Sequence, residues 1–192
     1  MRILLIAAGR VGGTRIGEWI GYETNIEYMH EPFSEWRNDV NIFLNKLRKE
    51  NDPMVVKVFP GEEWNRVKHF HWDKIIGITR TNVRECAESN AIALETNVWH
   101  SNYLVDLNWV IENEDKIKSI ESDINVMQND ILNNPHIELF ITYEGIFETG
   151  IDRIKLMNYL NISNPKCDAM LNSKYRYKKT NILEIPISKK LV

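Results

Sequence analysis

A glycine-rich turn that carries an arginine lies near the start of the chain, in the stretch LLIAAGRVGGTRIGEWI from Leu4 to Ile20. Small residues let backbone N–H groups close around a phosphate or sulfate, and a following helix points its positive end at the same anion. Arg10 adds a guanidinium that binds two anion oxygens at once and stays protonated at working pH. Gly12 and Gly13 permit close approach of the anion, and Thr14 supplies a hydroxyl. The stretch predicts an anion-binding loop; a tight turn with a solvated arginine is the alternative.

The loop sequence GRVGGT differs from that of ordinary ATPases. A Walker A motif reads GxxxxGK[ST], and here no lysine precedes Thr14. Arg10 can serve as the cation in place of that lysine. The missing lysine disfavours a P-loop kinase or related nucleotide phosphotransferase, which we keep as an alternative.

A second pair of polar residues lies in the segment IIGITRTNVRECAESNAIAL. A strand is expected to end at Thr79 and Arg80, and the next helix carries Ser89. At about 1.5 Å of rise per residue, Ser89 lies roughly 10 Å along this helix from Asn82. An arginine side chain and a phosphate together bridge such a span, so Arg80 and Ser89 are expected to face one crevice.

Charged residues also follow or interrupt two apolar segments. Glu31 comes after the segment IEYMH, and its carboxylate is expected on the crevice side; a turn carboxylate before Pro32 is the alternative. Alternation along a strand places His30 on the opposite face. Lys57 lies inside the apolar segment MVVKVF, where an unpaired ammonium would be costly. It therefore needs an anionic partner, either a bound anion or a carboxylate such as Glu31 or Glu144.

Short apolar segments alternate with helix-length segments along the chain. We expect buried strands before Gly9 and at 26–31, 54–59, 74–79 and 137–142. Apolar residues at 3–4 spacing predict helices at 34–50, with Ser34 as a cap candidate, at 82–96 and at 150–162. This alternation is typical of an α/β fold whose mostly parallel sheet binds ligands at the carboxyl ends of its strands. Each motif above falls at such an end.

Length and composition limit the classes of protein to consider. A chain of 192 residues fits one domain, 1–192, in which the polar stretch at about 106–134 is expected to be a helical insertion. A net charge of -3 gives no support for binding a nucleic acid polymer. No stretch approaches the roughly 20 apolar residues of a membrane span. Cys86 and Cys167 are isolated, which favours free thiols and a cytoplasmic location.

Taken together, these motifs resemble those of the sulfotransferases of the P-loop superfamily that use 3′-phosphoadenosine 5′-phosphosulfate (PAPS), especially the bacterial carbohydrate and glycolipid sulfotransferases. Their phosphosulfate loop commonly reads RSGST, and here residues 10–14 read RVGGT. Their 3′-phosphate motif is an arginine at a strand end and a serine on the next helix, as in Arg80 and Ser89. The segments YMHEPF and LFITYEGIFETGIDRIKLMNYLNI resemble two further landmarks, in the same order.

The resemblance implies a three-layer P-loop-type fold and a sulfotransferase that moves a sulfuryl group from PAPS to a hydroxyl of a carbohydrate or small-metabolite acceptor, without a metal. It implies that Glu31 is the base, with His30 as the rival. Arg10 and Lys57 would stabilise the charge that develops during transfer. The residues implied to bind the donor are Arg10, Gly12, Gly13, Thr14, Arg80, Ser89 and, beside Arg176 in the basic tail, Lys178 and Lys179.

Two departures from the family pattern leave a non-catalytic, nucleotide-binding protein as a further alternative. Val11 and Gly13 stand where the loop usually has serines, and Thr81-Asn82 replaces the proline or aspartate that usually follows the arginine. Among weaker candidates, His69 and His71 are spaced as a metal-binding pair but have no indicated third ligand. Trp99, His100 and Tyr103 are candidates for the lining of an acceptor pocket.

Overall fold

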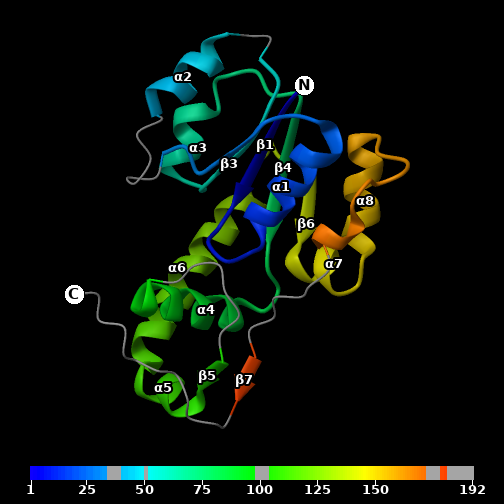
Figure 1. The fold of residues 1–192 in the computed structure, drawn as a ribbon. Helices are drawn as coiled ribbons and strands as arrows, with labels where there is room; N and C mark the ends of the chain where they lie inside the picture. The colour runs from blue at the N-terminus through cyan, green and yellow to red at the C-terminus, as the bar shows by residue number, and fades with distance from the viewer. Residues whose placement is uncertain (34–39, 50–51, 98–103, 172–177, 181–192) are drawn as a thin grey trace, which may run out of the picture.

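Five parallel strands form the central sheet in a computed structural model, which describes residues 1–33, 40–49, 52–97, 104–171 and 178–180 (Figure 1). The strands are β1 Arg2–Ala7, β2 Tyr28–His30, β3 Met54–Val58, β4 Lys74–Thr79 and β6 Leu139–Thr142. Their order is β2-β3-β1-β4-β6. β1 is therefore the middle strand, where Leu5 lies opposite Lys57 of β3 and Ile76 of β4. The expected parallel sheet of about five strands is confirmed.

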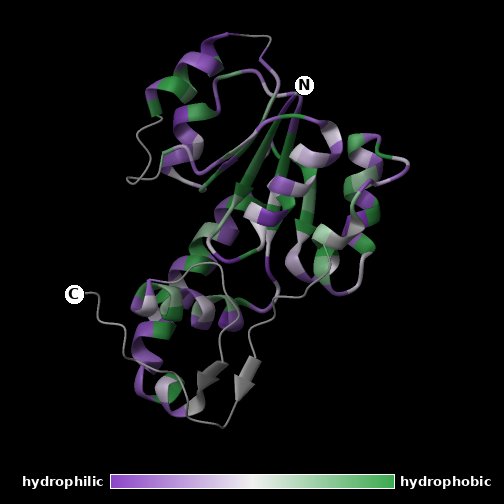
Figure 2. Cartoon of the chain, viewed as in Figure 1, coloured by the Kyte–Doolittle hydropathy of each residue, from purple (hydrophilic) through white to green (hydrophobic). Residues whose placement is uncertain are grey.

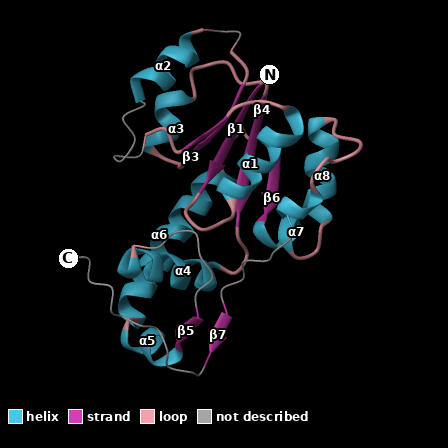
Figure 3. Cartoon of the chain, viewed as in Figure 1, coloured by secondary structure: helices cyan, strands magenta, loops and turns pink. Residues whose placement is uncertain are grey.

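Helices cover both faces of this sheet (Figure 3). They are α1 Gly13–Thr24, α2 Val40–Arg48, α3 Glu62–Val67, α4 Val83–Thr96, α5 Leu107–Glu112, α6 Glu114–Leu132, α7 Tyr143–Phe147 and α8 Ile151–Leu160, followed by a 3-10 turn at Asp168–Leu171. α2 and α3 lie on one side of the sheet, and α1, α7 and α8 lie on the other (Figure 1). A glycine-rich loop joins β1 to α1, so the chain has a P-loop-like α/β fold.

The core has two parts, one on each face of the sheet. Ile3 and Leu5 pack with Trp19 of α1 on the first face, whereas Leu4 and Ile6 pack with Phe43 of α2 on the second. All six residues of β1 are buried. A strand covered on both faces needs a continuous apolar run, which explains the sequence RILLIA and the hydrophobic colour of the central strands in Figure 2.

The sequence predicts some element ends well and others poorly. The side chain of Asn82 accepts a hydrogen bond from the N–H of Glu85 and caps α4, as its position before the helix predicts. The strand expected at 26–31 covers only Tyr28–His30, since Glu31 has a φ of 44°, which ends the extended chain. α2 begins at Val40, and the cap candidate Ser34 lies outside the described residues.

The stretch at 106–134 contains α5 and α6. α6 packs along α4 and buries Ile117 and Ile124 in the first part of the core. β5 Leu104–Asp106, just before α5, pairs in parallel with β7 Lys178–Thr180 in a separate two-stranded sheet (Figure 3). Across the residues that the structure describes, each helix is too short or too polar to span a bilayer.

Candidate functional site

The carboxyl ends of β1, β3 and β4 bring three of the sequence motifs to one edge of the sheet. The glycine-rich loop connects β1 to α1. Lys57 is the penultimate residue of β3, and Arg80 directly follows β4. β1 lies between the other two strands, so the loop is flanked on both sides by these cationic residues. This edge is where open parallel sheets bind their ligands.

Left-handed backbone conformations shape the loop between β1 and α1. Arg10 has a φ of 63°, and Gly12, the N-cap of α1, has a φ of 79°. The N-cap makes no side-chain hydrogen bond, and the first turn of α1 has no acidic residue. The first turn itself therefore supplies no negative charge of the kind that the positive end of a helix favours.

The packing of the loop explains why Val11 and Gly13 are not serines. Val11 is fully buried in the core on the side of α1, so its side chain does not face the site. A Cβ at Gly13 would lie 3.0 Å from Cβ of Ala7 and 3.2 Å from Cε of Lys57, because both side chains lie next to the start of α1. A glycine at position 13 thus makes room for a lysine that reaches the loop from β3.

Hydrogen bonds join the loop to Arg80 and Ser89. Arg10 Nε donates to Ser89 Oγ at 3.0 Å. Arg80 Nη1 donates to the carbonyl oxygen of Arg10 at 3.2 Å. Arg80 and Ser89 are each 7% exposed, so the three side chains form a compact, mostly buried group under the edge of the sheet.

Two carboxylates neutralise Arg80, which sequence reasoning did not predict. Glu85, in the first turn of α4, lies 2.9 Å from Nη2, and Glu144 lies 3.9 Å from Nε. The guanidinium also stacks 4.2 Å from the ring centre of Tyr143. Glu144 accepts hydrogen bonds from the N–H groups of Thr81 and Asn82, at 2.9 and 3.0 Å. Burial favours the protonated form of Glu144, but these bonds and Arg80 outweigh it and lower the pKa of the carboxyl.

An ion pair between Lys57 and Glu31 occupies the other side of the loop. Lys57 Nζ donates to Glu31 Oε1, and the side chains of Lys57 and Glu31 are 4% and 15% exposed. The requirement that Lys57 have an anionic partner is met, with Glu31 as that partner. Because the pair lies next to the start of α1, a carboxylate and a cation stand beside the glycine-rich loop.

His30 lies next to Glu31 and not on the opposite face, so the expectation from strand alternation is wrong here. His30 Nε2 is 3.6 Å from Glu31 Oε2. Alternation holds only along an extended chain, and the positive φ of Glu31 turns its side chain back toward that of His30. The ring also contacts Thr14 of the loop, with Nδ1 3.4 Å from Oγ1.

A second carboxylate, Glu63, interacts with Lys57 and Glu31 and was missed from the sequence. It lies in the first turn of α3, and its Oε2 accepts the N–H of Phe59 at 2.7 Å. Burial raises the pKa of Glu63; the N–H of Phe59 and Lys57 oppose this effect, and the charge of Glu31 adds to it. The signal in the sequence was GEEW, a glycine and two acids directly after a strand.

The remaining residues of interest take no part in the contacts described above. The thiol of Cys86 donates to the carbonyl of Gly9 at 3.1 Å, and burial raises its pKa to about 11, so it is a protonated thiol under the loop. His71 contacts Asp73 at 3.2 Å, and the described part of the chain holds no group of three metal-binding side chains. Lys178 and Lys179 lie in β7. Trp99, His100, Tyr103 and Arg176 lie outside the described residues.

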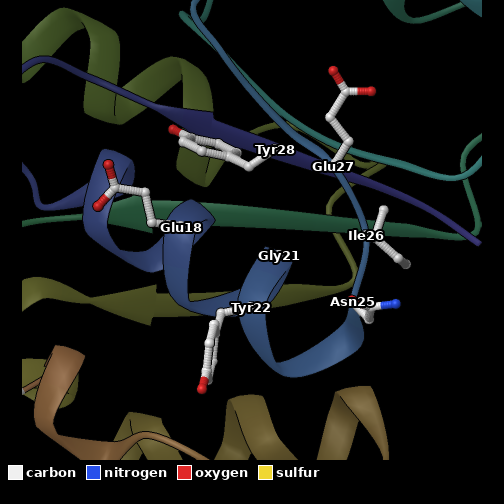
Figure 4. A pocket seen from close by; sticks show the side chains of 7 residues that line it. All are labelled: Glu18, Gly21, Tyr22, Asn25, Ile26, Glu27 and Tyr28. Atoms are coloured by element: carbon white, nitrogen blue, oxygen red, sulfur yellow. The ribbon is translucent and has the colours of Figure 1, made fainter.

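An open hollow of about 420 Å³ lies elsewhere, between the last turns of α1 and the start of β2 (Figure 4). Glu18 and Tyr22 line it from α1, and Glu27 and Tyr28 line it from the following segment. Since it lies near the amino end of β2, it is separate from the loop. Tyr28 takes part in both places, because its ring lines the hollow and its hydroxyl reaches His30, 3.2 Å from Nδ1.

Comparisons with known proteins give a limited result. No family model and no curated protein matches the chain. Among solved structures, a shikimate kinase from Aquifex aeolicus superposes with a TM-score of 0.43 and 16% identity, covering 84% of this chain and 98% of that one. An uncharacterized protein from Eubacterium ventriosum has a TM-score of 0.43 and 12% identity, with the same coverage. Similarity at this level does not assign an activity.

Proposed function

We propose that this protein is a sulfotransferase that moves the sulfuryl group of PAPS to a hydroxyl of a carbohydrate or small-metabolite acceptor. The observation that carries the proposal is the Lys57–Glu31 ion pair beside a glycine-rich loop, where Gly13 makes room for the Lys57 side chain. A carboxylate base and a cation thus stand at the end of the helix that favours an anion. Sulfuryl transfer needs this combination, because it requires both proton removal and stabilisation of negative charge.

The reaction follows from these positions. Glu31 takes the proton of the acceptor hydroxyl, and the acceptor oxygen forms a bond to the donor sulfur. The bond between sulfur and the bridging oxygen breaks, and 3′,5′-bisphosphoadenosine leaves. Lys57 and Arg10 stabilise the charge on the bridging oxygen and the transferring group, and Glu31 then releases its proton to solvent.

The donor would be held by the loop on one side and by the Arg80 group on the other. Gly12, Gly13 and Thr14 offer the first turn of α1 to the 5′-phosphosulfate, and Arg10 binds its oxygens. Arg80 and Ser89 are proposed to bind the 3′-phosphate, and Lys178 and Lys179 to close this side. Two free cysteines, Cys86 and Cys167, fit a reducing compartment such as the cytoplasm.

A nucleotide phosphotransferase is the second candidate. The strand order and the position of the loop between β1 and α1 fit it equally well, and one of the solved structures with a similar fold is a shikimate kinase. The lysine next to the start of α1 is Lys57, which comes from β3, whereas a kinase loop carries its own lysine before the threonine. This difference makes sulfuryl transfer the main proposal.

A transfer assay with two labelled donors separates the candidates. The wild-type protein would be incubated with sulfur-labelled PAPS and pools of carbohydrate and metabolite acceptors, and in parallel with ATP labelled in its γ-phosphate and Mg²⁺. We expect transfer of the sulfur label alone, reduced in Glu31→Gln and unchanged in the control Glu27→Gln, whose carboxylate is exposed and pairs with Lys46. Transfer of phosphate would establish the kinase, and nucleotide binding without transfer from either donor would establish a non-catalytic protein.

A further inference from the structure

The His30 ring is held by contacts at both of its nitrogens. Nδ1 lies 3.2 Å from the hydroxyl oxygen of Tyr28 and 3.4 Å from Oγ1 of Thr14. Nε2 lies 3.6 Å from Oε2 of Glu31, and both side chains are 15% exposed. Glu31 is thus contacted at one oxygen by Lys57 and approached at the other by His30.

Two glycines of α1 make this arrangement possible. A Cβ at Gly17 would overlap the ring of Tyr28, and a Cβ at Gly21 would lie 3.2 Å from the Cβ of Tyr28. The glycines are one turn apart, so together they form a groove on α1 that receives the tyrosine. In Figure 4 the Tyr28 ring lies along α1 and extends toward the side of Glu18. The groove therefore fixes where the Tyr28 hydroxyl meets His30.

The position of the Glu31 carboxylate indicates which nitrogen of a neutral His30 we expect to carry the proton. In a neutral imidazole one nitrogen donates and the other accepts. Oε2 of Glu31 lies 3.6 Å from Nε2, beyond hydrogen-bond distance, but the carboxylate favours electrostatically a proton on Nε2 over a lone pair. Nδ1 would then accept from the hydroxyl of Tyr28 or Thr14. We propose that His30 is a positioning residue for Glu31: Tyr28, seated in the Gly17–Gly21 groove, fixes the ring with its Nε2–H directed at the carboxylate that acts as base. This inference rests on the proposed role of Glu31.

The charge of His30 makes the base sensitive to pH. Among the described residues, the charged and titratable groups that interact with Glu31 include Lys57 from β3, His30 from β2 and Glu63 from α3. A protonated His30 would add a second positive charge beside Glu31 and weaken it as a base. It would also carry a proton on Nδ1, which could then no longer accept from Tyr28. The rate should therefore fall on the acid side as His30 becomes charged.

Three variants separate positioning from a merely structural role. His30→Ala removes the donor, and we expect kcat to fall by roughly tenfold to a hundredfold with an unchanged donor KM, since loss of orientation lowers the rate and not the binding. His30→Gln retains an N–H near the position of Nε2, so it should recover most of kcat and lose the acid-side fall that His30 causes. Tyr28→Phe should lower kcat more than its control Tyr22→Phe, which changes an exposed tyrosine on α1.

A readout that needs no substrate keeps this test independent of the proposed activity. The ¹⁵N signals of the His30 ring, recorded by NMR at mildly alkaline pH, report which nitrogen is protonated. We expect the Nε2–H form in the wild type and in Tyr22→Phe, and a mixture of both forms in Tyr28→Phe. The Nδ1–H form in the wild type, an unchanged spectrum in Tyr28→Phe, or equal rates for His30→Ala and wild type would overturn the inference. Absence of any transfer in the wild type would instead count against the proposed function.

Discussion

Arg10 donates a hydrogen bond from Nε to Ser89 Oγ across 3.0 Å and so joins the glycine-rich loop to α4. The carbonyl of the same Arg10 accepts a bond from Arg80. Two motifs about 70 residues apart in the sequence thereby form one unit, with Arg10 between them. A ligand that contacts the loop is consequently coupled to the residues that follow β4.

Removal of Arg10 should impair both donor binding and transfer. We expect Arg10→Ala to weaken the binding of 3′,5′-bisphosphoadenosine by tenfold or more, since a charge-assisted bond is worth about 1.5–3 kcal/mol. Ser89→Ala should have a smaller effect, because it leaves the guanidinium but removes the hydroxyl that orients it. Calorimetric titration measures both, with Arg48→Ala as an exposed control. Unchanged affinity in Arg10→Ala would contradict the assignment of the loop.

Glu31→Gln should separate binding from rate. The amide keeps the shape of the side chain but accepts no proton, so turnover should fall by roughly 10²–10⁴, the range for loss of a general base. Bisphosphate affinity should stay near that of the wild type, because Glu31 is not proposed to contact the donor. Steady-state kinetics and titration of the same preparation test this. A rate equal to that of Glu27→Gln would transfer the role of base to another group.

Glu85 should compete with the donor for Arg80. Its carboxylate lies 2.9 Å from the guanidinium, where a phosphate oxygen of a bound nucleotide would also be favoured. We therefore expect Glu85→Gln to bind the bisphosphate severalfold more tightly than the wild type. Glu85→Gln should still bind the bisphosphate more tightly than 5′-AMP, whereas the double variant Glu85→Gln, Arg80→Ala should bind the two nucleotides equally. Glu95→Gln, an exposed change on the same helix, is the control. Weaker binding by Glu85→Gln would show that Glu85 holds Arg80 in place for the ligand.

Glu144 should contribute to stability in a pH-dependent way. Its pKa in the folded protein is lowered, so its stabilisation is present above the ordinary pKa of glutamate and is lost as the pH falls through the lowered value. Glu144→Gln leaves the N–H groups of Thr81 and Asn82 without a charged acceptor, which should cost about 2–3 kcal/mol at neutral pH. Urea unfolding at neutral and acidic pH measures this difference. A difference of the same size at both would contradict the linkage.

The sequence predicts those features that depend on local patterns. The run RILLIA forms a strand because both faces of β1 are covered, and Asn82 caps α4 because its side chain reaches the N–H of Glu85. It does not predict features that depend on one unusual backbone angle or on tertiary packing. The φ of 44° at Glu31 places its carboxylate next to His30, against the alternation rule. The two carboxylates around Arg80 come from separate elements, so no sequence spacing predicts that they contact it.

Binding of 3′,5′-bisphosphoadenosine, the product of the proposed reaction, tests the central claim most directly, because Arg80 and Ser89 are proposed to bind a 3′-phosphate that ATP lacks. A ligand at 100 times its dissociation constant adds about 2.7 kcal/mol of stability, and each kcal/mol raises the melting midpoint of a chain of this size by roughly 2–4 °C. We predict a rise of about 5–10 °C with the bisphosphate, and much less with 5′-AMP or ATP and Mg²⁺. Arg80→Ala should remove the difference between bisphosphate and 5′-AMP. Stabilisation by ATP and Mg²⁺ without stabilisation by the bisphosphate would contradict the sulfotransferase proposal and favour the kinase.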